Sequence, residues 1–189
     1  FFYFFANDSI GEFPSKWNSN IGGDIVTYEG SNGKWLSMKA QGGNYIPELD
    51  MKFPDNTTIE FDLLITDNAD FAVTYYSEQK YDLNSYGVPG EAGSEVILSW
   101  STSDFKSYST NESDEGKEIL SSNDQFPLPI NKVTHVSIWI QKSRYRLYLD
   151  TEKIFDIPKG VFSGFVSNRF RFDTSNSSSD ILIGNFRMA

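Results

Sequence analysis

Alternation of apolar and polar residues with a period of two is the feature that most constrains the fold of this chain. It is clearest over residues 136–141 and 145–150, which flank a short polar break at residues 142–144. Successive side chains of a β-strand point to opposite faces, so this pattern predicts a hairpin with one buried face. A third run at residues 153–157 stops at Pro158 and extends the hairpin to a three-stranded meander.

Short runs of the same kind recur along the chain, separated by segments rich in Gly, Asn, Asp and Pro, which favour turns. They lie at residues 24–28, 34–39, 58–65, 71–76, 95–100, 169–173 and 181–188. No long segment keeps a helical stripe, and we expect at most one helical turn, at residues 115–120. The pattern predicts an all-β, antiparallel two-sheet sandwich of the jelly-roll type, formed by residues 1–189 as a single domain.

Two further segments are predicted to be long loops. Residues 78–94 are rich in Gly, Tyr and Pro, and residues 101–125 are rich in Ser and acidic residues. Loops of this length in a compact domain are often functional. We therefore expect these two loops to form one rim of the sandwich and to contribute to a binding site.

Composition excludes several classes of function. Lys and Arg total 16 against 26 Asp and Glu, and the net charge of -10 disfavours nucleic acid and anionic lipid as partners. Cysteine is absent, which excludes disulfides, thiolate nucleophiles and cysteine metal sites. No apolar run approaches the length of about 18 residues that a membrane-spanning helix needs, so we expect no membrane insertion by this domain.

Several segments resemble one known family. Residues 5–17, FANDSIGEFPSKW, and 181–187, ILIGNFR, are similar to the opening and closing segments of a module found before the peptidoglycan-binding domain of some OmpA-type outer-membrane proteins. Residues 58–63 resemble its first sheet strand, and residues 135–158 resemble a hairpin that laminin G-like sandwiches share. The resemblance implies a concanavalin A-like lectin/glucanase (laminin G-like jelly-roll) fold and no assigned enzymatic activity.

The resemblance also implies a setting and a function. We expect a piece of a longer protein of the Gram-negative cell envelope, located in the periplasm, outer membrane or cell surface. The predicted function is a non-catalytic extracytoplasmic module that recognises a glycan or an envelope protein. Two alternatives remain open: a divergent glycoside hydrolase of the laminarinase-like fold, and a structural spacer beside a peptidoglycan-anchoring domain. The sequence leaves the oligomeric state open.

The hydrolase alternative lacks its expected motif. Laminarinase-type enzymes resemble one another in a Glu-x-Asp-x-Glu strand that projects its carboxylates from one face. Here Glu60 and Asp62 match, but Leu64 stands in the third position. We therefore interpret Glu60 and Asp62 as solvent-facing residues of a strand and predict no catalytic residue. His135, the only histidine, has no nucleophile motif to assist and is interpreted as structural.

Glycan recognition, if present, needs aromatic rings, which offer flat apolar faces to sugars. The rings near the two predicted loops are the candidate ligand-binding residues, namely Tyr75, Tyr76, Tyr81, Tyr86, Trp100 and Tyr108. The remaining tryptophans, Trp17, Trp35 and Trp139, are assigned to packing.

Calcium is the one cofactor that the sequence leaves open. Residues 111–116 carry oxygen ligands at alternate positions, but Ser122 occupies the place of the last EF-hand ligand. Asp67, Asp70 and Asp114 are the candidate metal ligands, with a solvent-exposed loop as the alternative interpretation of each group.

Overall fold

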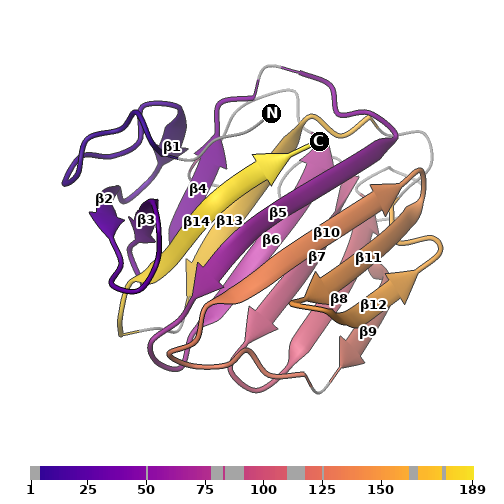
Figure 1. Ribbon diagram of the computed structural model, residues 1–189. Helices are drawn as coiled ribbons and strands as arrows, with labels where there is room; N and C mark the ends of the chain where they lie inside the picture. The colour runs from indigo at the N-terminus through magenta and orange to yellow at the C-terminus, as the bar shows by residue number, and fades with distance from the viewer. Residues whose placement is uncertain are drawn as a thin grey trace.

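The computed structural model describes residues 5–49, 51–77, 83, 92–109, 118–124, 126–161, 166–175 and 178–189. These residues form two antiparallel seven-stranded sheets packed face to face (Figure 1). The front sheet, nearer the viewer, has the order β12 (Glu152–Ile157), β11 (Arg144–Leu149), β10 (Thr134–Gln141), β5 (Asn56–Leu64), β14 (Ile181–Met188), β3 (Lys34–Met38) and β2 (Gly23–Thr27). The back sheet has the order β1 (Trp17–Ser19), β4 (Gly43–Pro47), β13 (Arg169–Ser175), β6 (Asp70–Ser77), β7 (Ala92–Ser99), β8 (Ser103–Ser109) and β9 (Glu118–Asp124).

The predicted two-sheet sandwich is confirmed. Each of the ten predicted strand runs coincides with a strand of the structure, and the meander at β10, β11 and β12 has its turns at Lys142 and Asp150, both with positive φ. Those turns suit the right-handed twist of the strands they join. Among the described residues no helix is formed, and none is therefore long and apolar enough to cross a membrane.

Residues 101–125 depart from the prediction of a long loop, because they contain the hairpin of β8 and β9. The expected helical turn is wrong where the structure describes it, since residues 118–120 begin β9. On β8 the inward positions are Ser103, Phe105 and Ser107, so only one of the three inward side chains is apolar. Small hydroxyl side chains hid the alternation that marks the other strands. β1 and β4 were missed as well, β4 because its Gly43-Asn44 start is typical of a turn.

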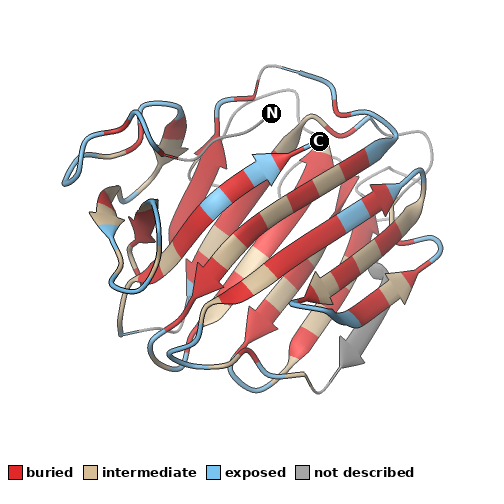
Figure 2. Ribbon diagram, viewed as in Figure 1, coloured by how far each residue is buried: buried red, intermediate tan, exposed pale blue. Residues whose placement is uncertain are grey.

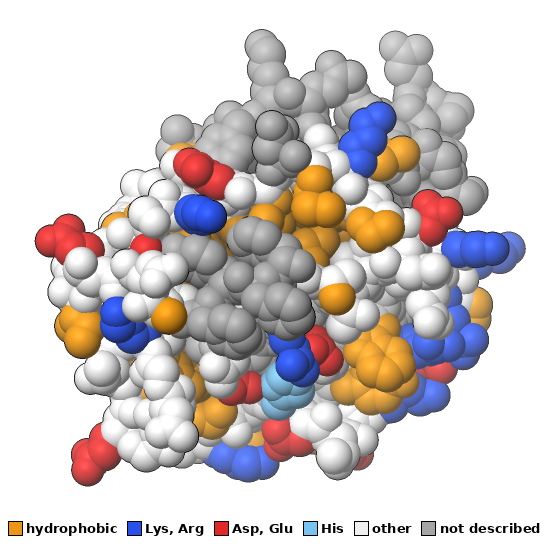
Figure 3. All heavy atoms as spheres, turned by 45° about the horizontal axis from the view of Figure 1, so that its top comes forward, with side chains coloured by type: hydrophobic (Ala, Val, Ile, Leu, Met, Phe, Trp, Pro, Cys, Tyr) orange, Lys and Arg blue, Asp and Glu red, His pale blue; other side chains and the backbone are white. Residues whose placement is uncertain are grey.

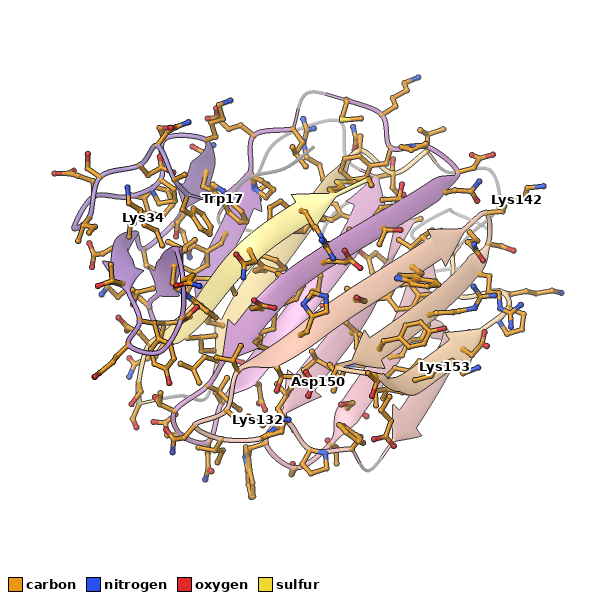
Figure 4. All side chains as sticks on the ribbon, in the orientation of Figure 1. Trp17, Lys34, Lys132, Lys142, Asp150 and Lys153 are labelled. Atoms are coloured by element: carbon orange, nitrogen blue, oxygen red, sulfur yellow. The ribbon has the colours of Figure 1, made fainter. Side chains whose placement is uncertain are left out.

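The space between the sheets is filled by aromatic side chains from both. Phe61 of the front sheet contacts Phe172 of the back sheet with ring centroids 4.9 Å apart, and Phe71 lies 5.1 Å from Phe172. Trp17 stacks on Phe172 at 5.8 Å and meets Phe186 edge-on at 5.5 Å. Five rings from both sheets thus form one contiguous core, and Trp17, labelled in Figure 4, brings the short strand β1 into it.

The outer faces of the two sheets differ (Figure 2). In the front sheet β5 and β11 alternate between buried and partly exposed residues along most of their length. In the back sheet β4 is buried at every position and β6 over most of its length. A strand that is buried on both faces has something covering its outer side. The back sheet therefore carries side chains that face away from the core and are still shielded from water.

Candidate functional site

The outer face of the back sheet presents a set of polar side chains that strand pairing places side by side. Phe172 of β13 and Val73 of β6 are paired and both point into the core. Because successive side chains of a strand point to opposite faces, the next residues, Arg171 and Thr74, point away from the core. One row across the sheet contains Arg171, Thr74, Glu95 and Lys106 on β13, β6, β7 and β8. A neighbouring row contains Asn44, Asp173, Ala72, Ile97 and Asp104, and a third contains Arg169, Tyr76, Gly93 and Tyr108.

Four of these residues form the centre of the site. The Arg171 side chain, 2% exposed, places its Nε 2.7 Å from the Asp173 carboxylate two residues along the same strand. The Thr74 hydroxyl lies 3.3 Å from Glu95 Oε2 and 3.5 Å from Asp173 Oδ2. A hydroxyl has one proton to donate, so Thr74 bonds one carboxylate at a time or shares its proton between them. Three strands thus bring two carboxylates to opposite sides of one hydroxyl.

Burial controls the charge of this centre. Burial raises the pKa of Asp173 from 3.8 to about 6, against the opposing effect of the Arg171 charge and in the same direction as the nearby Glu95 charge. Desolvation disfavours the ionised form of a carboxyl, and a like charge nearby adds to the effect. Asp173 therefore exchanges its proton in a pH range where an ordinary aspartate is fully ionised.

Two tyrosines lie beside this centre. Tyr76 and Tyr108 are both buried, in the row that also contains Gly93. A Cβ atom at Gly93 would lie 2.4 Å from the Tyr108 hydroxyl, so the Tyr108 side chain crosses the sheet directly over this glycine. Burial, followed by the charge of Glu95, raises the pKa of Tyr108 above its ordinary value of 10. Tyr108 is consequently a neutral phenol that can donate a hydrogen bond.

The far side of the site is bounded by Asn44 of β4. Its side-chain Nδ2 donates to the Leu83 carbonyl at 2.8 Å, and its backbone N–H donates to Asn20 Oδ1 at 2.8 Å. Leu83 belongs to the connection between β6 and β7, and Asn20 to the connection between β1 and β2. Two connections from different parts of the chain thus meet the edge of the polar face.

This arrangement suits an uncharged polar ligand. Arg171 and the Tyr108 hydroxyl donate hydrogen bonds, the carboxylates of Glu95 and Asp173 accept them, and Thr74 does either. Positive and negative charges are interspersed, so the face has no strong preference for an ion. The polar groups are held by fixed partners, and the rings of Tyr76 and Tyr108 pack beside them with little exposed surface.

The structure separates the residues that the sequence predicted to bind a ligand. Tyr76 and Tyr108 lie together on the back-sheet face, whereas Tyr75 points into the core and stacks on Phe53 with centroids 5.5 Å apart. Trp100, 47% exposed, lies in the turn after β7. Tyr81 and Tyr86 lie outside the described residues.

The carboxylates that the hydrolase alternative considered lie on the opposite side of the molecule. Glu60 and Asp62 point outward from the front sheet, while Ile59, Phe61 and Leu63 between and beside them are buried, as predicted. Asp62 Oδ1 lies 2.7 Å from Nδ1 of His135, the neighbouring residue on β10. The interpretation of His135 as a structural residue of a strand agrees with this contact.

One packing assignment is wrong. Trp17 and Trp35 are buried, but Trp139 is 39% exposed on the outer face of the front sheet. The register explains it, because Val136, Ile138 and Ile140 occupy the inward positions of β10 and leave Trp139 on the other face. Even Trp35 packs outside the main core, with its ring against Gly184 and its Nε1 donating to Ser31 at 3.1 Å.

The candidate metal ligands do not converge in the part of the chain that the structure describes. Asp67 accepts hydrogen bonds from the backbone N–H and the hydroxyl of Ser178, and so ties the β5–β6 turn to the segment before β14. Asp70 begins β6 and pairs with Ser99 and Ser175. Asp114 lies outside the described residues, and within them no group of three or more acidic or histidine side chains could hold a metal ion.

Sequence reasoning missed the central residues of the site. Thr74, Glu95, Arg171 and Asp173 lie on three strands separated by up to a hundred positions, and each looks like an ordinary polar residue on the outer side of its strand. The one local signal is Arg171-Phe172-Asp173, which places opposite charges on one face of a strand around a buried ring. That signal is weak, because many exposed strands share it.

Comparison with known proteins yields structural matches alone. No protein-family model matches the chain, and no curated protein matches its sequence. The carbohydrate-binding module CBM66 from Bacillus subtilis matches with a TM-score of 0.58 and 16% identity over 92% of this chain and 94% of that one. The potassium-bound carbohydrate recognition domain of Emp46p matches with a TM-score of 0.60 and 15% identity over 92% and 88%.

A candidate glycosyl hydrolase from Parabacteroides distasonis is also similar, with a TM-score of 0.58 and 16% identity over 99% of this chain and 92% of that chain. Identities this low establish the fold and leave function to the residues of the site. The chain is therefore a jelly-roll sandwich of the type found in carbohydrate-binding modules and lectins.

Proposed function

We propose that this chain is a non-catalytic carbohydrate-binding module whose ligand contacts the outer face of the back sheet. The observation that carries the proposal is the cluster of Arg171, Thr74, Asp173 and Glu95 beside two tyrosines, on a face that points away from the core. Sugars present many hydroxyls, and this cluster brings hydrogen-bond donors and acceptors together, with Glu95 and Asp173 partly exposed. The similarity to a carbohydrate-binding module and a carbohydrate recognition domain supports the same ligand class.

Affinity electrophoresis through gels containing single polysaccharides tests this proposal. The panel comprises levan, inulin, laminarin, galactan, mannan and peptidoglycan-derived glycan strands. We expect at least one polysaccharide to retard the chain, and Glu95→Gln and Thr74→Val to reduce that retardation by about tenfold in apparent affinity, the equivalent of about 1.4 kcal/mol. Glu152→Gln, a matched change at an exposed position of the front sheet, serves as the control.

Circular dichroism and thermal unfolding establish that each variant is folded. Retardation that Glu95→Gln and Thr74→Val leave unchanged would place the ligand elsewhere on the molecule. An absence of retardation by every member of the panel would contradict the proposal itself.

A glycoside hydrolase is the second candidate, and one observation favours it. Glu95 and Asp173 flank the same hydroxyl, and burial raises the pKa of Asp173 to about 6, which is the property that a general acid needs near neutral pH. The Arg171 ion pair, which stabilises the ionised form of Asp173, argues against that role. Release of reducing sugar that Glu95→Gln or Asp173→Asn abolishes, and Glu152→Gln does not, would establish hydrolysis.

The envelope setting also belongs to this proposal. We infer an extracytoplasmic location, in the periplasm, outer membrane or cell surface, from the similarity of residues 5–17 and 181–187 to modules of OmpA-type proteins. The proposal includes an envelope protein as a partner beside or instead of a glycan, and a spacer role is the alternative. Fractionation of the native host with an antibody to this chain, followed by cross-linking, tests both points. Recovery in the cytosolic fraction would contradict them.

A further inference from the structure

The outer face of the front sheet carries a second cluster that the proposed function leaves unused. A shallow hollow of about 190 Å³ lies over the ends of β5 and β14 and is lined by Thr58, Glu60, Arg187 and Ala189. Thr58 and Ala189 exchange two backbone hydrogen bonds, of 2.7 and 3.0 Å, which fix the floor of the hollow. Pairing of β5 with β10 places Trp139 beside Thr58 and Ser137 beside Glu60.

The polar groups of the hollow are held in place by their neighbours. Ser137 donates to Glu60 Oε1 at 3.1 Å, and the Arg187 guanidinium donates to Glu60 Oε2 through its Nε. In the next row the Asp62 carboxylate contacts His135 and accepts from Asn185 Nδ2 at 2.6 Å. Figure 3 shows the histidine of the chain, in pale blue, among acidic and basic side chains on this face.

These groups keep unused hydrogen-bonding capacity. A guanidinium has five N–H donors and a carboxylate about four acceptor sites, so the Arg187–Glu60 pair can bind a further partner on its solvent side. The Arg187 side chain is 45% exposed and lines the hollow. Because each charge has an opposite charge beside it, the pair favours a neutral ligand with both donor and acceptor groups over an ion.

Trp139 supplies the apolar surface. Its ring is tilted against Tyr148 on β11, with centroids 5.1 Å apart, and this contact restricts its rotation while part of the ring stays open to solvent. A flat ring beside fixed hydroxyl-binding groups is complementary to a sugar ring, which has apolar C–H faces and polar edges. The volume is below the 300–1,000 Å³ that is usual for small-molecule pockets, which limits the ligand here to about one ring.

We propose that the outer face of the front sheet is a second saccharide-binding site, in which one neutral sugar ring packs on Trp139 and bonds its hydroxyls to Glu60 and Arg187. The two sheets face opposite directions, so this site is separate from the back-sheet face and does not depend on it. A chain with both sites holds two sugar residues on opposite sides of the domain. Such an arrangement would bridge two glycan strands.

Indole N–H signals in a two-dimensional NMR spectrum of the ¹⁵N-labelled chain test the proposal. The chain has four tryptophans, and Trp139→Phe and Trp100→Phe each remove one signal and so assign the two exposed rings. The probes are neutral trisaccharides derived from maltose, cellulose, laminarin, galactan and levan. We expect at least one to shift the Trp139 signal saturably while the Trp100 signal stays in place.

Variants then define the site. We expect Glu60→Gln and Trp139→Ala each to raise the dissociation constant measured in this titration by about tenfold, which corresponds to about 1.4 kcal/mol. For Trp139→Ala the readout is the backbone amide of Thr58. Thr74→Val on the back sheet is the matched control and should leave the response of Trp139 unchanged.

Failure of this proposal and failure of the proposed function give different results. A panel in which no sugar shifts the Trp139 signal overturns the second site, whatever the back sheet binds. A Trp139 response that Thr74→Val abolishes also overturns it, because the two faces would then not be independent. A Trp139 response that persists while every back-sheet variant behaves as wild type supports the second site and counts against the first.

Discussion

The ion pairs on the outer faces of the two sheets differ in how far they are shielded from water. On the front-sheet side, the cations of the ion pairs Arg187–Glu60, Arg144–Asp156 and Lys132–Asp150 are 43% to 59% exposed, so solvent stabilises their charge. Figure 4 labels Lys132 and Asp150 of the third pair. On the back sheet, Arg171 pairs with Asp173 while almost fully shielded from water. Desolvated charges cost far more than exposed ones, so the back sheet keeps such a pair at the expense of stability. Costly polar groups of this kind are typical of functional sites.

Replacement of the arginine of one pair on each face gives the largest expected difference. Arg171→Met leaves Asp173 without its cation in a largely buried position, and we expect the free energy of unfolding to fall by about 3 kcal/mol. Arg187→Met breaks an exposed pair and should cost less than about 1 kcal/mol. Urea unfolding at pH 7 measures both values. Equal costs for the two variants would mean that the faces do not differ in the way described.

The two faces also differ at a glycine. On each face an aromatic side chain packs directly over a glycine, Tyr108 over Gly93 and Trp35 over Gly184. A Cβ at Gly93 would lie 2.7 Å from the Tyr75 carbonyl oxygen as well as against Tyr108, whereas at Gly184 it would meet the Trp35 ring at 2.8 Å. Backbone cannot move aside as a side chain can, so we expect Gly93→Ala to cost about 2 to 3 kcal/mol and Gly184→Ala somewhat less. Thermal unfolding ranks them, and the reverse order would contradict this explanation.

The pH dependence of stability should have opposite signs on the two faces. The pKa of Asp173 is about 6 in the folded chain and 3.8 in its ordinary state, so the folded state holds its proton more tightly. The stability that protonated Asp173 contributes is present below about pH 4. It is lost as the pH rises to about 6, by on the order of 3 kcal/mol. The Arg144 and Lys153 side chains instead lower the pKa of Asp156, whose contribution is present above pH 3.8 and is lost on acidification.

Unfolding of the wild type, Asp173→Asn and Asp156→Asn between pH 3 and 8 measures these contributions as differences between curves. The Asp173→Asn curve should lack the decrease between pH 4 and 6 that the wild type shows, and Asp156→Asn should lose stability mainly at the higher pH values. A wild type and an Asp173→Asn variant with parallel curves over this range would rule out the raised pKa.

The smallest expected effect concerns the exposed ring of the front sheet. Trp139→Ala removes its contact with Tyr148 and should lower the free energy of unfolding by about 1 kcal/mol, the magnitude of one aromatic pair. The buried Phe172→Ala on the back sheet is the comparison and should cost 3 kcal/mol or more, on the order measured for large core deletions. A large loss for Trp139→Ala would identify the ring as part of the packing, as its sequence context had suggested.

Local pattern determined most of the fold of this protein. The alternation at residues 136–141 and 145–150 predicted both strands and their buried faces, because side-chain direction along a strand follows from backbone geometry alone. The same rule correctly predicted that Glu60 and Asp62 point outward. It failed at β8, where Ser103 and Ser107 face inward without being apolar, and at Trp139, where an apolar ring faces outward.

Only the tertiary structure decided which polar residues meet and which are shielded. Thr74, Glu95 and Asp173 are distant in sequence and come together because β6 lies between β7 and β13, an order that no local pattern encodes. The raised pKa of Asp173 has the same origin, since desolvation depends on what covers a side chain rather than on its neighbours in the chain. The sequence alone thus determined a sandwich with alternating faces, and strand order and burial decided where its candidate binding surface lies.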